Sequence, residues 1–187
     1  MIGLQRIRRE QVLREAEGYL ELISAFGSQW SLPPSVRDPV AQRAIDVLAK
    51  LDKVPGRRAH VQLLKGQALR AMERCREAVE PLKAATEFDN QNIEAFLALA
   101  WCYKRIGRLD LAIQALEEAL AADAAQAIVH YNLACYWSLA RNPKLAVAYL
   151  SRAFDLDTNY RDMVGEETDF DPIRNHPDFL ALTSVIV

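Results

Sequence analysis

The eight residues from Ala78 to Ala85, AVEPLKAA, return twice along the chain at a constant interval. The later copies are AIQALEEA at residues 112–119 and AVAYLSRA at residues 146–153. Each copy begins and ends with alanine and has leucine in fifth place. Side chains spaced by four and then three residues lie on one face of an α-helix. The stretch therefore predicts a helix that recurs once per repeat and packs through its alanine and leucine face.

Two more columns of residues keep the same interval upstream of each copy. Small residues, which let two helices approach closely, fill one column: Gly66, Ala100 and Ala134. Large apolar residues, which fill the adjacent holes, occupy the other: Leu69, Tyr103 and Trp137. The columns therefore indicate two packed helices in every repeat.

Residues typical of helix ends divide the repeats. Gly107 is a good helix stop, and Asn142-Pro143 combines a cap with a proline suited to a first helical position. We expect helices at 59–72 and 75–88, at 93–106 and 109–122, and at 127–140 and 143–156. Pro81 falls inside the second of these and predicts a local bend there.

The period, the small-residue columns and the run Leu99-Ala100-Trp101-Cys102-Tyr103 resemble the tetratricopeptide repeat family. The resemblance implies an all-α, right-handed superhelical solenoid of antiparallel helix pairs. It covers three repeats, at 59–92, 93–126 and 127–160. Residues 1–58 are predicted to form a degenerate first repeat, with helices at 5–26 and 40–51 and an inserted loop at 27–38. Residues 161–187 are predicted to form an acidic segment and a C-terminal cap of short helices, because a repeat stack needs a terminal cover.

Composition and charge limit the classes of function that the protein can have. The chain has 187 residues, of which 51% are hydrophobic and 26% charged, which excludes wholesale disorder. A net charge of −2 argues against nucleic acid as a partner. The charge is uneven, with +6 over residues 1–76 and −8 over residues 77–187. This asymmetry suggests either ordinary solvated faces or a weak homo-oligomer held by head-to-tail attraction.

The cellular location of the protein is predicted by asking whether the sequence has an export signal or a membrane-spanning segment. No apolar stretch follows the basic residues near the start, and no apolar run approaches the roughly 18 residues of a membrane span. The three cysteines, Cys75, Cys102 and Cys135, are predicted to be reduced, buried thiols. We therefore expect a cytoplasmic protein without a membrane partner.

The sequence gives only weak signals for a metal site, a catalytic site or a phosphate-binding site. Residues 155–166 have acidic residues at the spacing of a calcium loop, but Tyr160 stands where the sharp turn needs glycine. His130 and Cys135 lack the paired spacing of zinc ligands, and the seven glycines form no phosphate loop. We predict no enzyme activity, no metal and no cofactor.

The resemblance implies that the first helix of each repeat lines a concave face. Several residues on this face are not needed for packing inside a repeat. They include both apolar and cationic side chains, which suits the binding of an acidic or apolar peptide. This predicted stripe comprises Leu63, Gln67, Arg70, Leu97, Trp101, Lys104, Arg105, Tyr131 and Asn132. The alternative is that the stripe packs against neighbouring helices or lies under the chain's own tail.

The predicted function is a non-catalytic scaffold that binds a peptide or protein segment in the concave groove. The alternatives are a secretion-type chaperone for a client protein and a self-assembling structural repeat protein. Some family members grip a peptide C-terminus with cationic side chains. The matching places here hold no cation, which argues against such a clamp: Leu63, Gln67, Ala98 and Ile128.

Overall fold

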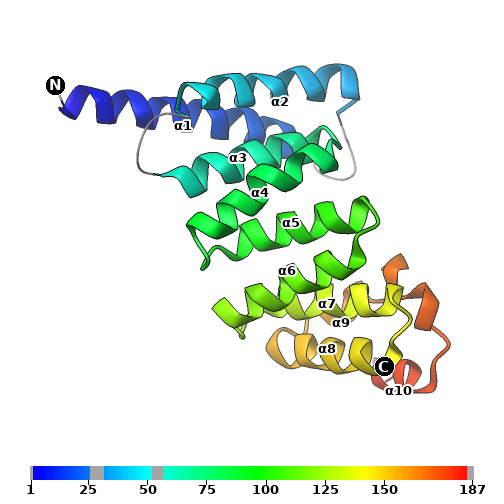
Figure 1. The fold of residues 1–187 in the computed structure, drawn as a ribbon. Coiled ribbons are helices and arrows are strands. Elements are labelled where there is room, and N and C mark those ends of the chain that lie inside the picture. Colours follow the sequence, from blue (N-terminus) through cyan, green and yellow to red (C-terminus); the bar gives the residue numbers. More distant parts are fainter. Residues whose placement is uncertain (1, 26–31, 52–56, 185–187) are drawn as a thin grey trace. The chain divides into compact units, whose positions relative to one another are not determined.

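The computed structural model describes residues 2–25, 32–51 and 57–184, and helices are the only regular elements in these residues. Figure 1 shows them as successive coils along the chain. The α-helices are α1 (Ile2–Ser24), α2 (Pro34–Leu48), α3 (Arg58–Ala71), α4 (Cys75–Phe88), α5 (Ile93–Arg105), α6 (Leu109–Ala122), α7 (Ala127–Leu139), α8 (Pro143–Leu156), α9 (Tyr160–Met163) and α10 (Pro177–Thr183). Two 3-10 helices accompany them, η1 (Ala49–Leu51) and η2 (Thr168–Ile173).

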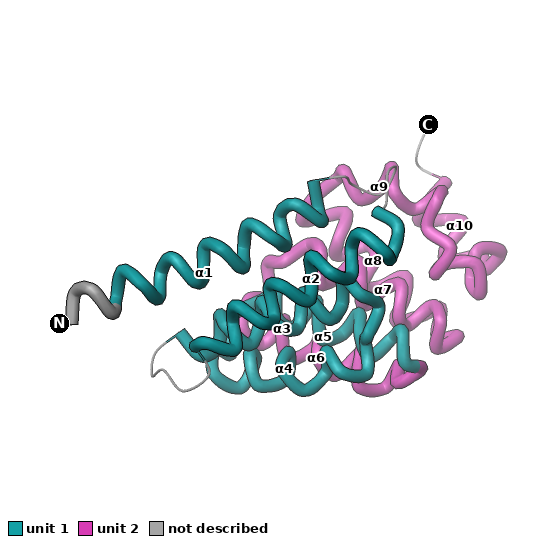
Figure 2. Tube along the Cα trace, turned by 90° about the horizontal axis from the view of Figure 1, so that it is seen from above, with its two compact units in different colours: residues 1–106 teal, residues 107–187 magenta. Residues whose placement is uncertain are grey.

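The chain divides into two compact units, residues 1–106 and 107–187, which Figure 2 draws in different colours. In unit 1 each helix from α1 to α5 packs on the next one, and α3 also contacts α1 and α5. The core of its first helices is made of alanine and branched residues, including Ala16, Ala44, Leu48 and Leu64. Unit 1 is therefore a layered stack of antiparallel helices.

In unit 2, α6 packs on α7 and α7 on α8, and the segment after α8 folds back over them. The 3-10 helix η2 lies against α7, whereas α10 lies against α8. Phe170 of η2 and Phe179 of α10 are almost fully buried, with ring centroids 5.4 Å apart. The aromatic side chains of this C-terminal segment therefore cover the last helix pair.

One turn recurs between the paired helices. Glu73, Gly107 and Arg141, which stand at the same place in successive repeats, all have a left-handed φ, of 59°, 79° and 57°. Glycine takes this conformation without a steric penalty, whereas the other two residues adopt it at some cost. The side chains of Asn92 and Asn142 cap the helices α5 and α8 by accepting hydrogen bonds from backbone amides in their first turns.

The first helix pair departs from the prediction. α2 begins at Pro34, six residues before the expected start at residue 40, and continues through Pro39. The reason is that Pro33 is extended while Pro34 takes the first helical position, where a proline has no amide to lose. The predicted loop at 27–38 was thus too long, and its part at 27–31, with Trp30, lies outside the described residues. In the part of the chain that is described, no helix has the length and apolarity needed to cross a bilayer.

Candidate binding face on α1, α3 and α5

A pocket of about 460 Å³ opens in unit 1 between α1, α3 and the start of α5. Its apolar floor comes from Leu20 and Ile23 of α1 and from Leu63 and Leu64 of α3. Its rim is polar and includes Glu17, Glu21, His60, Gln67, Arg70 and Glu94. The first helices of successive pairs thus line one hollow.

Two polar contacts tie the walls of this pocket together. His60 Nε2 of α3 lies 2.7 Å from Glu17 Oε1 of α1. Gln67 of α3 donates a hydrogen bond to Glu94 of α5, over 2.5 Å. Both contacts are partly or fully exposed, so a ligand can reach these groups. The carboxylates give this part of the rim a negative character.

Beside the pocket, the ring of Trp101 lies near two cations. The guanidinium carbons of Arg70 and Arg105 are each 5.6 Å from its ring centroid. Such distances are typical of cation–π attraction, which holds a large aromatic side chain in a defined orientation. We call Arg70, Trp101 and Arg105 the Trp101 cluster. Because Arg70 also lines the pocket, the pocket and the cluster are continuous.

The other predicted residues of unit 1 differ in exposure. Leu63 is 3% exposed and belongs to the pocket floor, whereas Leu97, Trp101 and Lys104 are half-buried and Arg105 is exposed. Leu63 is buried because α1 packs over α3 at this place. Helical spacing predicts which residues share a face of a helix, but it does not predict how deeply each of their side chains is buried.

The predicted residues of unit 2 lie in a different environment. Tyr131 is 4% exposed, and its ring centroid lies 4.8 Å from that of Tyr160 and 5.7 Å from that of Phe170. The chain's own C-terminal segment therefore covers this side chain, so Tyr131 offers no open binding surface in this conformation. Asn132 is half-buried and donates a hydrogen bond to the carbonyl of Ile128 on its own helix, over 2.8 Å.

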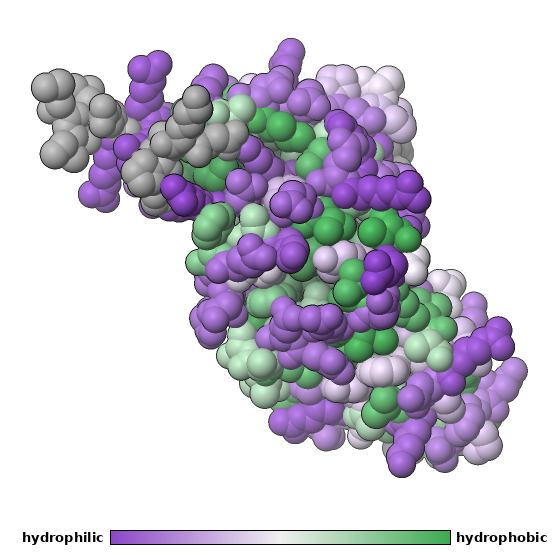
Figure 3. Space-filling view, in the orientation of Figure 1, coloured by the Kyte–Doolittle hydropathy of each residue, from purple (hydrophilic) through white to green (hydrophobic). Residues whose placement is uncertain are grey.

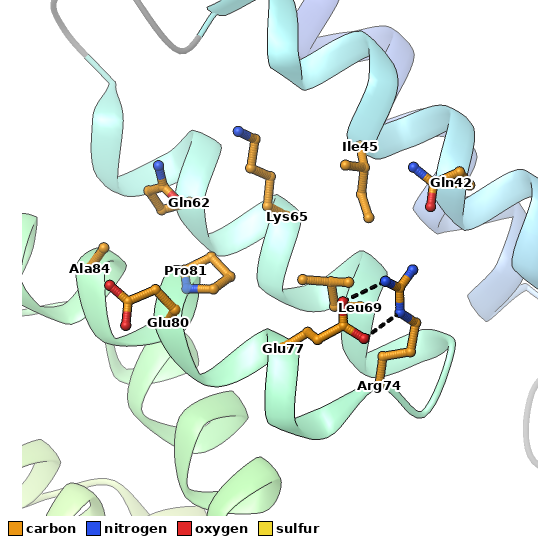
Figure 4. A pocket seen from close by; sticks show the side chains of 10 residues that line it. All are labelled: Gln42, Ile45, Gln62, Lys65, Leu69, Arg74, Glu77, Glu80, Pro81 and Ala84. Atoms are coloured by element: carbon orange, nitrogen blue, oxygen red, sulfur yellow. Dashed lines mark hydrogen bonds and ion pairs between the residues drawn. The ribbon is translucent and has the colours of Figure 1, made fainter.

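A second pocket of about 480 Å³, not predicted from the sequence, lies between α2, α3 and α4. Figure 4 shows the side chains that line it, among them Gln62 and Lys65 of α3 and Pro81 of α4, with Arg74 paired to Glu77 at one end. The hydrogen bond from Arg74 holds the pKa of Glu77 below its usual range. Pro81 stays inside α4, as predicted, and lines this pocket. Both polar and apolar side chains surround the space, and its shape could not be predicted from the repeat.

The described residues contain no cluster of three or more histidine, cysteine or acidic side chains that could hold a metal ion. The three cysteines are buried free thiols, as predicted. Burial, together with the neighbouring Cys75, raises the pKa of the Cys102 thiol to about 12. This thiol is therefore a packing residue at neutral pH, because thiolate is the reactive form.

Large apolar side chains also reach the surface away from the pocket. In unit 1 these are Ile7, Leu22, Val36 and Phe88, and in unit 2 they are Ile128, Met163 and Leu180. Figure 3 shows hydrophobic patches interspersed with hydrophilic side chains on the face that it draws. Scattered exposed apolar residues of this kind are common on proteins, and by themselves they mark no binding site.

Comparisons with known proteins agree with the repeat pattern. Residues 69–134 match a family model described as tetratricopeptide repeat. The crystal structure of MamA is similar with a TM-score of 0.67 at 17% identity, over 79% of this chain and 84% of that one. A MamA structure from Desulfovibrio magneticus RS-1 gives a TM-score of 0.58 at 18% identity, over 82% of this chain and 95% of that one.

YrrB, described as a tetratricopeptide repeat protein with an unusual peptide-binding site, is similar with a TM-score of 0.59 at 22% identity. The similarity covers 67% of this chain and 64% of YrrB. No curated protein sequence matches the chain significantly. The family model and the solved structures both agree with the repeating columns of the sequence: residues 69–134 match tetratricopeptide repeats, and the fold class of the chain is an all-α solenoid of the tetratricopeptide type.

Proposed function

We propose that the protein is a non-catalytic interaction scaffold that binds a protein segment on the face formed by α1, α3 and α5. The observation that carries this proposal is the continuity of the α1–α3–α5 pocket with the Trp101 cluster through Arg70. An apolar floor beside a positioned aromatic ring is the usual arrangement of an interface anchor. Charged groups at the rim supply orientation and specificity.

The family supports the general role. Tetratricopeptide repeats serve widely as protein-interaction modules, and one similar structure, YrrB, is described as having a peptide-binding site. The partner of the present chain is proposed to be a peptide or an unfolded protein segment, because the pocket extends across three helices rather than closing around a small molecule.

The proposal is tested by selecting a random-peptide display library on the full chain and measuring the affinity of the enriched peptides by fluorescence anisotropy. Trp101→Ala is expected to weaken binding at least tenfold, about 1.4 kcal/mol. The matched control is Phe88→Ala, which removes an aromatic side chain that is 53% exposed at the end of α4, outside the pocket. This control is expected to keep full affinity.

Circular dichroism of each variant separates binding from folding. A folded Trp101→Ala protein that retains the affinity of the unchanged chain would place the binding site elsewhere. Recovery of the chain itself as the dominant partner in a mixing experiment would favour self-assembly over the scaffold role. Suppression of a client's aggregation without enrichment of short peptides would favour the chaperone role.

A further inference from the structure

We propose that the Trp101 cluster recognises an acidic segment that carries one aromatic side chain. This inference rests on the proposed function and specifies the chemistry of its partner. It comes from two independent features. In unit 1, two arginines beside Trp101 have no carboxylate partner among the described residues, and in unit 2 an aromatic side chain of the chain itself covers the equivalent helix face.

The first feature is the charge of the cluster. Among the described residues, Arg70 and Arg105 contact the ring of Trp101, and neither of them forms an ion pair. Other arginines of unit 1 do have carboxylate partners, such as Arg37 with Asp38 and Arg74 with Glu77. Guanidinium groups that stack on an aromatic ring keep their N–H edges available for carboxylates. The cluster therefore presents an anion-binding edge beside an apolar ring.

The second feature is the repeat register. Tyr131 and Cys135 of α7 stand one repeat after Leu97 and Trp101 of α5. In unit 2 this face is occupied, because Phe170 packs edge-on against Tyr131 and is fully buried. The chain around Phe170 reads EETDFD over residues 166–171, an aromatic residue set among carboxylates. The protein thus contains its own example of an aromatic side chain, from an acidic segment, that packs on this helix face.

The two faces differ in a way that favours such a ligand in unit 1. The face of α7 has Tyr131 and Cys135, both uncharged and buried, whereas the face of α5 has Leu97 and a half-buried Trp101 with arginines beside it. An aromatic side chain can lie on Leu97 and Trp101 as Phe170 lies on Tyr131. The flanking carboxylates would then meet the two arginines of the cluster.

The test uses a fluorescent synthetic peptide with the sequence of residues 165–173, GEETDFDPI, and the full-length protein. Anisotropy is expected to show binding that weakens as salt rises, because surface charge attraction is screened. A peptide with alanine in place of Phe170 is expected to bind at least tenfold more weakly. A peptide whose carboxylate side chains are all replaced by amides is expected to lose the salt dependence and most of its affinity.

On the protein side, Arg70→Gln combined with Arg105→Gln is expected to weaken binding of the peptide at least tenfold. The matched control is Arg43→Gln, which removes an exposed arginine of α2 that does not line the α1–α3–α5 pocket. Trp101→Phe keeps an aromatic ring and is expected to retain most of the affinity, which distinguishes a stacking surface from a folding defect. Circular dichroism confirms that each variant remains helical.

Failure of this inference can be distinguished from failure of the proposed function. If library peptides bind through Trp101 but contain neither acidic nor aromatic residues, the scaffold role stands and the acidic aromatic partner is wrong. If GEETDFDPI and its amide version bind equally, charge recognition by the arginines is likewise overturned. If no peptide depends on Trp101, both proposals fail together.

Discussion

A Cβ atom built on Gly66 of α3 would lie 2.4 Å from the side chain of Leu82 on α4. Real Cβ contacts are essentially never shorter than 3.0 Å, so the glycine is required by the close approach of the paired helices. Ala100 and Ala134 occupy the same column in the next two repeats, and both are fully buried. The first pair of the predicted repeats therefore packs more closely at this column than an alanine allows.

We expect Gly66→Ala to lower the free energy of unfolding by about 1–3 kcal/mol, because the added methyl group must displace Leu82. Urea titration followed by circular dichroism measures the change. Gly18→Ala in α1 is the matched control, since no atom lies within 4 Å of its added Cβ. That control is expected to stabilise the helix by about 0.5–1 kcal/mol. Equal effects of the two substitutions would argue against the close contact.

The recurring turn gives a second prediction. Gly107 has φ 79° with open space around it, so Gly107→Ala is expected to destabilise through backbone strain alone, by about 1 kcal/mol. Arg141→Gly, at the equivalent turn, relieves such strain but gives the unfolded chain more freedom. These effects oppose each other, so we expect Arg141→Gly to be neutral or to stabilise by a few tenths of a kcal/mol.

Arg152→Gly in α8 is the control for that comparison, because it places glycine at an exposed position within a helix. It is expected to destabilise by about 1 kcal/mol. Thermal unfolding of the three variants, measured together, gives the order. If Arg141→Gly is as harmful as Arg152→Gly, the left-handed turn at residue 141 imposes no strain.

The helices from residue 58 to residue 156 follow the sequence prediction within one residue at each end, because columns at a fixed interval reveal both the helix face and its breaks. The start of α2 does not follow the sequence prediction, because the pair Pro33-Pro34 is as typical of a turn as of the beginning of a helix. Tyr131 shows a second feature that the sequence pattern could not predict. Its position on the helix face follows from spacing, but Phe170, which covers it, comes from a distant segment with no repeat pattern.

The pockets illustrate the same limit. The spacing of Leu63, Gln67 and Arg70 indicates which face of α3 they share, and all three line the α1–α3–α5 pocket. The contribution of Glu17 and Glu21 was not foreseen, because α1 lies outside the clear repeats and its register on α3 depends on tertiary packing. The contribution of α1 to the acidic rim is therefore a finding of the structure.

A third prediction concerns the hydroxyl of Tyr131, which is buried and has no hydrogen-bond partner among the described residues. A buried polar group without a partner destabilises the folded state by about 1–3 kcal/mol. Tyr131→Phe keeps the ring contacts with Tyr160 and Phe170, so we expect it to raise the free energy of unfolding by about 1 kcal/mol. Chemical denaturation measures the gain.

Tyr19→Phe serves as the control for Tyr131, since its hydroxyl is exposed and donates a hydrogen bond to Glu15 over 3.4 Å. Its effect is expected to stay within about 0.5 kcal/mol. A loss of stability in Tyr131→Phe would mean that the hydroxyl is hydrogen-bonded in solution. The ring would still be part of the core, because its burial does not depend on the hydroxyl.

The last prediction concerns alkaline pH. Burial, with Cys75 adjacent, raises the pKa of Cys102 from an ordinary value of 9.0 to about 12. The folded chain therefore holds this thiol neutral above the pH at which the unfolded chain ionises it. Its contribution to stability is complete below pH 9.0 and is lost progressively as pH rises toward 12. The urea midpoint is accordingly expected to fall as pH rises above 9.0.

Cys102→Ala separates the thiol from the other groups that titrate in this range. Burial also raises the pKa of Tyr131, so the substitution should reduce the alkaline fall of the urea midpoint without abolishing it. Ultraviolet absorbance of the thiolate offers an independent readout, because the ionised sulfur absorbs where the neutral thiol does not. Ionisation of Cys102 in the folded protein at pH 9.0 would contradict its burial, because desolvation disfavours the charged form.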